Sequence, residues 1–284
     1  MGLFDFLKDY VALAHQEDSK GNYLKAAEYL ERAYYTKKDS SLLMSAAIRF
    51  ERGRKYEDML RCVQEAAKAG NGDAMCWLGE LCRDGNIVRQ SLMLAESYFQ
   101  CAVAKGCRGA YRQWGLMYSG VVAKHVDSGN RGDLPQAVKT DYKRAMELFM
   151  KGHNAGCGDC SNEVGLLYIH GKGVPVDEKE AMRYFQIAAD RNNRVGCLNL
   201  AIAHYEAWNG ERNDELAYKY FIKADQLGSS AAQKWLSKDK TKLRSHVEME
   251  AKDFAKKMGE TVLESAVDAL TGAIVGGVCD KIIK

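Results

Sequence analysis

Hydrophobic residues recur along this chain at three- and four-residue steps, which is the spacing of one face of an α-helix. In residues 22–34 this face carries Tyr23, Ala26, Ala27, Leu30, Ala33 and Tyr34. We expect residues 4–16 to form its antiparallel partner, and residues 40–51 and 55–69 to form a second helix pair. From about Val247 the same spacing predicts one more amphipathic helix. The pattern therefore indicates an all-α protein.

A second, longer period lies on top of the helical one. Its markers are Gly70, Gly106, Gly156, Asn192 and Gly228, separated by steps of 36, 50, 36 and 36 residues. A small residue follows nine positions after each marker, namely Gly79, Gly115, Gly165, Ala201 and Ser237. Alanine precedes the later markers by eleven positions, at Ala95, Ala145, Ala181 and Ala217. A fixed period of this length predicts stacked helix pairs that bury one another's apolar faces.

The one long step contains an insertion, roughly residues 121–140, that is rich in Gly, Asp, Lys and Arg. Insertions within repeats map to loops, which often lie on the binding face. We favour the simpler interpretation, a tolerated surface loop.

Composition adds few constraints. Of the 284 residues, 46% are hydrophobic and 2 are proline, so long helices are possible. A net charge of +3 does not predict binding to nucleic acid. The nine cysteines are irregularly spaced and no secretory signal precedes them, which predicts free thiols in a cytoplasmic protein.

Several segments resemble known repeat families. Trp114-Gly115-Leu116-Met117-Tyr118, Val164-Gly165-Leu166-Leu167-Tyr168 and Gly171-Lys172-Gly173-Val174 resemble Sel1-like repeats over residues 71–237. Residues 1–70 are more similar to plain tetratricopeptide helix pairs, and residues 238–284 resemble neither. The resemblance implies a right-handed α-solenoid of six to seven helix pairs, followed by a non-repeat helical segment. It specifies the fold and not the function, because such repeats bind many different partners.

The resemblance also implies that the first helix of each pair lines a concave groove. In the central repeats the groove positions are polar: Asp73, Cys76, Glu80, Arg83, Asp84 and Arg112. In the later repeats they are largely apolar: Leu166, Ile169, His170, Val195, Leu198, Ile202 and Tyr205. An apolar patch of this extent is expected to be covered, either by a partner or by the C-terminal helix folding back. Self-coverage costs less loop entropy and is slightly favoured.

Candidate chemistry is weak. His153, Cys157, Cys160 and the nearby His170 are residue types that bind zinc, but Cys160 takes the place of Ala74 and Ala110 in other repeats. We therefore interpret these cysteines as packing residues and expect no metal or cofactor. No nucleophile, base and orienting group stand in a recognisable motif, so we expect no enzymatic activity.

The resulting hypothesis is a non-enzymatic adaptor that binds a protein or peptide in its groove. One alternative is an immunity protein or secretion chaperone dedicated to one effector. An alternative of another class is a hydrolase that depends on Cys and His. Contact between the C-terminal helix and a membrane surface is a further, less favoured possibility.

Overall fold

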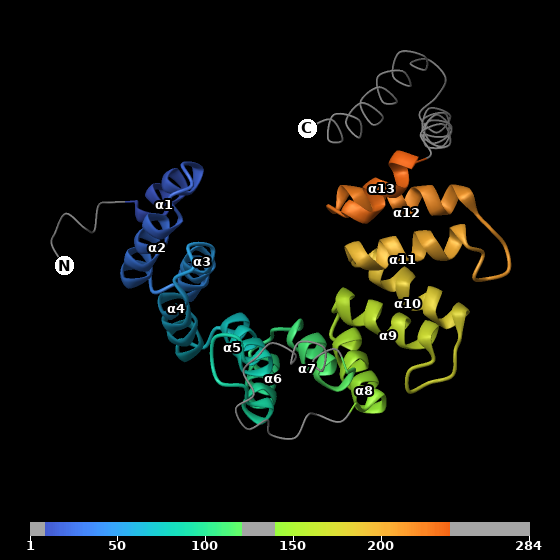
Figure 1. The fold of residues 1–284 in the computed structure, drawn as a ribbon, viewed down its shortest axis with the longest axis horizontal. Helices are drawn as coiled ribbons and strands as arrows, with labels where there is room; N and C mark the ends of the chain where they lie inside the picture. Colours follow the sequence, from blue (N-terminus) through green and yellow to red (C-terminus); the bar gives the residue numbers. More distant parts are fainter. Residues whose placement is uncertain (1–8, 121–139, 239–284) are drawn as a thin grey trace, which may run out of the picture. The chain divides into compact units, whose positions relative to one another are not determined.

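The computed structural model describes residues 9–120 and 140–238. These residues form thirteen α-helices and no strand, which confirms the predicted all-α fold (Figure 1). The helices are α1 (Tyr10–Ser19), α2 (Tyr23–Lys37), α3 (Ser40–Arg52), α4 (Tyr56–Lys68), α5 (Gly72–Asp84), α6 (Leu92–Ala104), α7 (Ala110–Tyr118), α8 (Tyr142–Asn154), α9 (Gly158–His170), α10 (Glu178–Asp190), α11 (Arg194–Tyr205), α12 (Asp214–Gln226) and α13 (Ser230–Lys238).

Successive helices pack as pairs, from α1 with α2 to α11 with α12, and α13 packs on α12. The chain forms two compact units, one up to Ala155 and one from Gly156. Unit 1 contains α1–α8 and unit 2 contains α9–α13. Residues 121–139 of the expected insertion and residues 239–284 of the expected C-terminal segment lie outside the described residues.

The five marker residues are the points at which one pair ends and the next begins. All five have a left-handed backbone, with φ of 88°, 84° and 87° at Gly70, Gly106 and Gly156, 56° at Asn192 and 85° at Gly228. Glycine and asparagine are the residues that most readily adopt this conformation at a helix C-terminus. The regular spacing of the markers therefore reflects the helix ends that the backbone requires.

The residue after four of the five markers caps the next helix, whereas α7 begins only at Ala110, three residues after Cys107. The side chains of Asn71, Asn193 and Ser229 accept hydrogen bonds from the backbone N–H three residues on, which is the usual N-cap interaction. Each of these three connections thus consists of the C-cap residue of one helix, one left-handed residue and the N-cap residue of the next helix. So short a connection holds consecutive helix pairs at a constant spacing.

The small residue nine positions after the marker allows the two helices of a pair to approach closely. A Cβ atom built on Gly79 would lie 2.6 Å from Cε1 of Phe99, and one on Gly165 would lie 2.6 Å from Cε1 of Phe185. At Gly115 the corresponding distance to Phe149 is 2.3 Å. These phenylalanines, together with Phe221 of α12, are among the largest fully buried side chains. In the pairs α5–α6, α7–α8 and α9–α10, a buried phenylalanine ring therefore lies directly against the glycine of the first helix.

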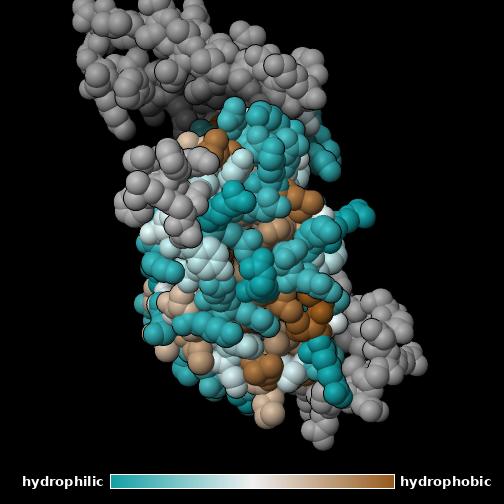
Figure 2. Space-filling view, turned by 90° about the vertical axis from the view of Figure 1, so that its left-hand side faces the viewer, coloured by the Kyte–Doolittle hydropathy of each residue, from teal (hydrophilic) through white to brown (hydrophobic). Residues whose placement is uncertain are grey.

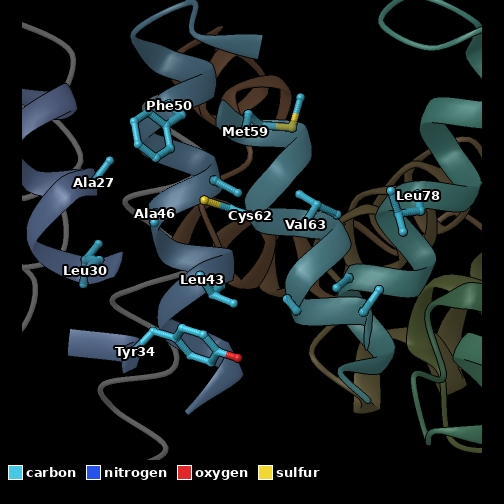
Figure 3. Close-up of a cluster of buried hydrophobic side chains, with 14 of the residues drawn as sticks. Ala27, Leu30, Tyr34, Leu43, Ala46, Phe50, Met59, Cys62, Val63 and Leu78 are labelled. Atoms are coloured by element: carbon cyan, nitrogen blue, oxygen red, sulfur yellow. The ribbon is translucent and has the colours of Figure 1, made fainter. Parts of the chain in front are cut away.

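The core of unit 1 runs between successive helices (Figure 3). Leu30 of α2, Leu43 and Phe50 of α3, and Met59 and Val63 of α4 face one another in a single buried cluster. The core of unit 2 includes Phe185, Leu200, Phe221 and Leu236. No helix among the described residues is long and apolar enough to span a membrane.

Candidate functional site

The first helices of neighbouring pairs pack against one another within each unit, α5 on α7 and α9 on α11. In unit 2 a pair of short side chains joins them, because Nδ2 of Asn199 donates to Oδ1 of Asn162 at 2.8 Å. The second helices α10 and α12 are bridged by longer side chains, with the Tyr220 hydroxyl donating to Oε1 of Gln186 at 2.7 Å. The first helices of unit 2 thus lie closer together than the second helices. We call the surface formed by α5 and α7, or by α9 and α11, the first-helix face of its unit.

The first-helix face of unit 1 carries interacting charges. Nε of Arg83 lies 2.6 Å from Oδ1 of Asp84, and Nη1 of Arg83 donates to Oε1 of Gln113 at 2.8 Å. Burial raises the pKa of the Glu80 carboxyl, and the nearby Arg83 and Arg112 oppose this effect. The structure therefore brings Glu80, Arg83 and Arg112 together.

Two thiols extend this polar region toward the start of α7. Cys76 and Cys107 share a hydrogen bond that lowers the pKa of Cys107, and the Asp73 carboxylate also contacts Cys107. Asp73 itself is exposed in the first turn of α5, whereas Cys76 is buried. Cys107 was not among the residues expected to line the groove, although it directly follows the marker Gly106.

The first-helix face of unit 2 is apolar. Leu166 and Ile169 of α9, and Leu198 and Ile202 of α11, are half-buried and pack against the core of the unit. Val195 begins the stripe on α11 and is 40% exposed. The structure thus places most of the predicted apolar positions in one cluster, with their outer surfaces still accessible among the described residues.

The two remaining predicted positions differ from this stripe. The rings of Tyr205 and Trp235 of α13 pack edge to face, with their centres 4.7 Å apart. The Arg212 guanidinium lies over the Tyr205 ring, 4.1 Å from the centre of that ring. His170 is exposed at the C-terminal end of α9. His204, which precedes Tyr205 in the sequence, stacks on the Tyr220 ring, and burial lowers the pKa of the His204 imidazole. Tyr205 therefore belongs to the packing of the last helices as well as to the face.

Within the described ranges, no group of three or more His, Cys, Asp or Glu side chains is placed to hold a metal ion. Cys157 is the N-cap of α9, and its sulfur accepts a hydrogen bond from the backbone N–H of Cys160 at 3.4 Å. The N-cap role of Cys157 was not recognised from the sequence. It could have been, because Asn71, Asn193 and Ser229 hold the same position in other repeats.

Comparison with known proteins identifies the repeats. The model of the Sel1 repeat family matches residues 10–35, 72–107, 159–193 and 195–229. The chain belongs to the Sel1-like repeat family. The first matched stretch lies in the part of the chain for which plain tetratricopeptide pairs were expected.

Similar solved structures include two bacterial proteins. The crystal structure of a Sel1 repeat protein from Oxalobacter formigenes has 18% sequence identity and a TM-score of 0.59, and the match covers 88% of this chain and 100% of that one. The structure of an immunity protein from Pseudomonas aeruginosa has 17% identity and a TM-score of 0.47, covering 80% of this chain and 74% of that one. The first of these shows the fold that the Sel1-like chain shares. A comparison with curated proteins finds no match.

Proposed function

We propose that this Sel1-like protein is a non-enzymatic scaffold that binds a protein segment on its first-helix faces. Sel1 repeat proteins are generally protein-interaction scaffolds. The observation that carries the proposal is the apolar stripe of unit 2, in which Val195, Leu198 and Ile202 follow one another at helical spacing on α11. Apolar anchors at such spacing are a common way for a helical surface to hold a peptide.

The apolar stripe of unit 2 is suited to binding because the helices that carry it are held in place by the rest of the unit. Leu198 and Ile202 are held from below by the core of unit 2, and the Asn162–Asn199 hydrogen bond joins the two helices that present them. A preorganised surface loses little conformational entropy when a partner binds. We therefore expect the partner segment to contribute apolar side chains to unit 2.

The polar face of unit 1 supports a second set of contacts. The Asp73 carboxylate is an exposed acceptor, whereas the Arg83 guanidinium is already bonded to Asp84 and Gln113. Charged groups at the edge of an interface mainly set specificity and association rate. A partner that contacts this face is expected to carry a basic residue opposite Asp73.

The test uses peptides selected from a display library against the full chain. Val195→Glu places a charge in the stripe, whereas Val176→Glu places the same charge in the α9–α10 loop, where the valine is 63% exposed. We expect Val195→Glu to weaken binding at least tenfold, about 1.4 kcal/mol, and Val176→Glu to leave it unchanged. Equal affinities for both variants and the wild type would reject the first-helix face of unit 2 as the binding surface.

The alternative of an immunity protein or chaperone for one effector stays a prediction. It requires a stable one-to-one complex with a single protein, which size-exclusion chromatography with light scattering would measure. Selection of many unrelated peptides with similar affinities would favour the general adaptor.

A further inference from the structure

Two cysteines meet at the first turn of α9. The segment Cys157-Gly158-Asp159-Cys160 places Cys157 at the N-cap and Cys160 in the first helical turn. The Cys157 sulfur accepts the backbone N–H of Cys160 at 3.4 Å, and the Cys160 side chain also hydrogen-bonds to it. One sulfur atom therefore receives both donors of the same neighbouring residue.

Oxygen acceptors hold this position elsewhere in the chain. Asn71, Asn193 and Ser229 cap α5, α11 and α13 with side-chain oxygens at 2.9, 2.7 and 3.2 Å from the capped N–H groups. A neutral thiol is a weak acceptor, whereas a thiolate is a strong one, and a helix N-terminus stabilises negative charge. The position therefore favours the ionised form of Cys157.

The surroundings of the sulfur act in the same direction. The hydrogen bond from Cys160, helped by the backbone N–H groups of Cys160 and Asp159, lowers the pKa of Cys157 to about 6, against the opposing effects of burial and the Asp159 carboxylate. The Arg191 guanidinium donates to Oγ of Ser161 at 2.8 Å and lies 3.4 Å from the Cys157 carbonyl oxygen. The lowered pKa raises the thiolate fraction of Cys157 near neutral pH.

The spacing of the two residues suits a disulfide. Residues three apart in a helical turn have Cα atoms about 5 Å apart, and disulfides join Cα atoms separated by about 4.4–6.8 Å. The two sulfur atoms already face one another, so bond formation requires side-chain rotation and no movement of a helix. The buried Cys197 differs, since burial raises its pKa.

We propose that Cys157 and Cys160 form a dithiol that hydrogen peroxide oxidises to a reversible disulfide. The Cys157 thiolate attacks one peroxide oxygen, the O–O bond breaks, and a sulfenic acid and hydroxide form. The Cys160 sulfur then attacks the Cys157 sulfur, the S–O bond breaks, and the departing oxygen leaves as water with the Cys160 proton. Two sulfur atoms lose one electron each, and peroxide is reduced to water.

Burial determines which oxidant and which sulfur react first. Cys157 is 8% exposed and Cys160 is fully buried. A small oxidant such as peroxide reaches the first sulfur, while the second is available only from inside the protein. Cys157 is therefore the attacking residue and Cys160 the resolving one.

The test treats the reduced full chain with stoichiometric peroxide, alkylates the remaining thiols and digests with trypsin. Both cysteines lie on one tryptic peptide, residues 152–172. We expect this peptide to lose two hydrogen atoms, to take up no alkylating group, and to return to the dithiol with dithiothreitol. We also expect alkylation of Cys157 to be at least tenfold faster than that of Cys197.

Variants can be chosen from residues that the other repeats use, so that folding is preserved. Cys157→Asn retains a cap like that of Asn71 and should leave Cys160 unreactive. Cys160→Ala matches Ala74 and should leave Cys157 as a sulfenic acid that dimedone traps. Cys197→Ala is the control and should not change the oxidation. The proposal is overturned if peptide 152–172 remains a dithiol while other cysteines are oxidised, or if Cys160 is oxidised equally in Cys157→Asn.

Discussion

Replacing Gly165 by leucine tests the packing of the repeats most sharply. A Cβ atom at this position would lie 2.6, 2.8 and 3.0 Å from Cε1, Cδ1 and Cζ of Phe185. Ordinary carbon contacts are about 3.5–4.0 Å, so even one added carbon requires the ring to move. Phe185 is fully buried and its ring lies 6.4 Å from that of Trp208, which leaves it little room.

The expected cost follows from these contacts. Overpacking a well-packed core typically costs about 1–3 kcal/mol. Leucine adds three carbons beyond Cβ, so we expect about 2 kcal/mol or more by the same principle. For a chain of this size a loss of 2 kcal/mol lowers the melting temperature by about 4–8 °C. Thermal unfolding followed by circular dichroism measures this shift.

Gly109 offers a matched control for this substitution. Nothing lies within 4 Å of a Cβ atom built on Gly109, and its φ is −62°, which any residue adopts. Gly109→Leu should therefore leave the melting temperature unchanged within about 1–2 °C, since surface substitutions typically change stability by less than about 0.5 kcal/mol. A Gly165→Leu protein that melts with the wild type would refute the close approach of α9 and α10 and, with it, the repeat register.

Three further predictions concern other parts of the chain. Titration of the denatured, freshly purified protein should find nearly all nine cysteines as free thiols, and several stable disulfides between repeat helices would contradict the cytoplasmic location expected from the sequence. Burial raises the folded-state pKa of Glu80, so ionisation of this carboxyl opposes folding at pH values above its unfolded-state pKa, and Glu80→Gln should raise the melting temperature at pH 7. This gain should disappear as the pH falls below 4.5. A gain that does not depend on pH would argue against a buried carboxylate at this position. The sequence predicts that Phe254, Met258, Val262 and Leu270, which lie outside the described residues, cover apolar surface of the repeats. Deleting residues 243–284 should then cause the protein to bind a hydrophobic dye or to self-associate. A truncated protein that is monomeric, binds no dye and is equally stable would contradict this prediction.

The repeat architecture could be predicted from sequence because its signals are local. A left-handed residue at a helix end selects glycine or asparagine, so Gly70 and Asn192 stand out without any knowledge of tertiary contacts. The crossing of α9 and α10 selects glycine at position 165 for a similar steric reason. Each of these constraints acts at a single position, and the same residue types therefore recur at the repeat period.

The details of the candidate site depend on side chains that meet from different helices. The hydrogen bonds of Arg83 with Gln113 and of Asn199 with Asn162 join residues that are far apart in sequence. The N-cap role of Cys157 could have been inferred from its repeat position, but its hydrogen bonds with Cys160 depend on the exact start of α9. Sequence patterns locate helix boundaries only to within a few residues.

Apolar residues are also exposed on other surfaces of the protein, so exposure alone does not identify a binding surface. The positions of the apolar residues along a helix must also place them on one face. Figure 2 shows one face of the molecule, on which hydrophobic residues lie in separate patches among hydrophilic ones. Single exposed residues, such as Tyr35 at 44% and Ile48 at 40%, are normal for a folded protein. The stripe of unit 2 differs because Val195, Leu198 and Ile202 share one helical face.

The proposed function is tested most directly by site-specific photocrosslinking in the cells that produce the protein. A photoreactive phenylalanine analogue would replace Val195 on the first-helix face or, as the control, Val176 in the α9–α10 loop. We expect the probe at Val195 to capture a discrete protein partner that the probe at Val176 does not capture. Identical products from both positions, or none from Val195, would contradict binding on the first-helix face.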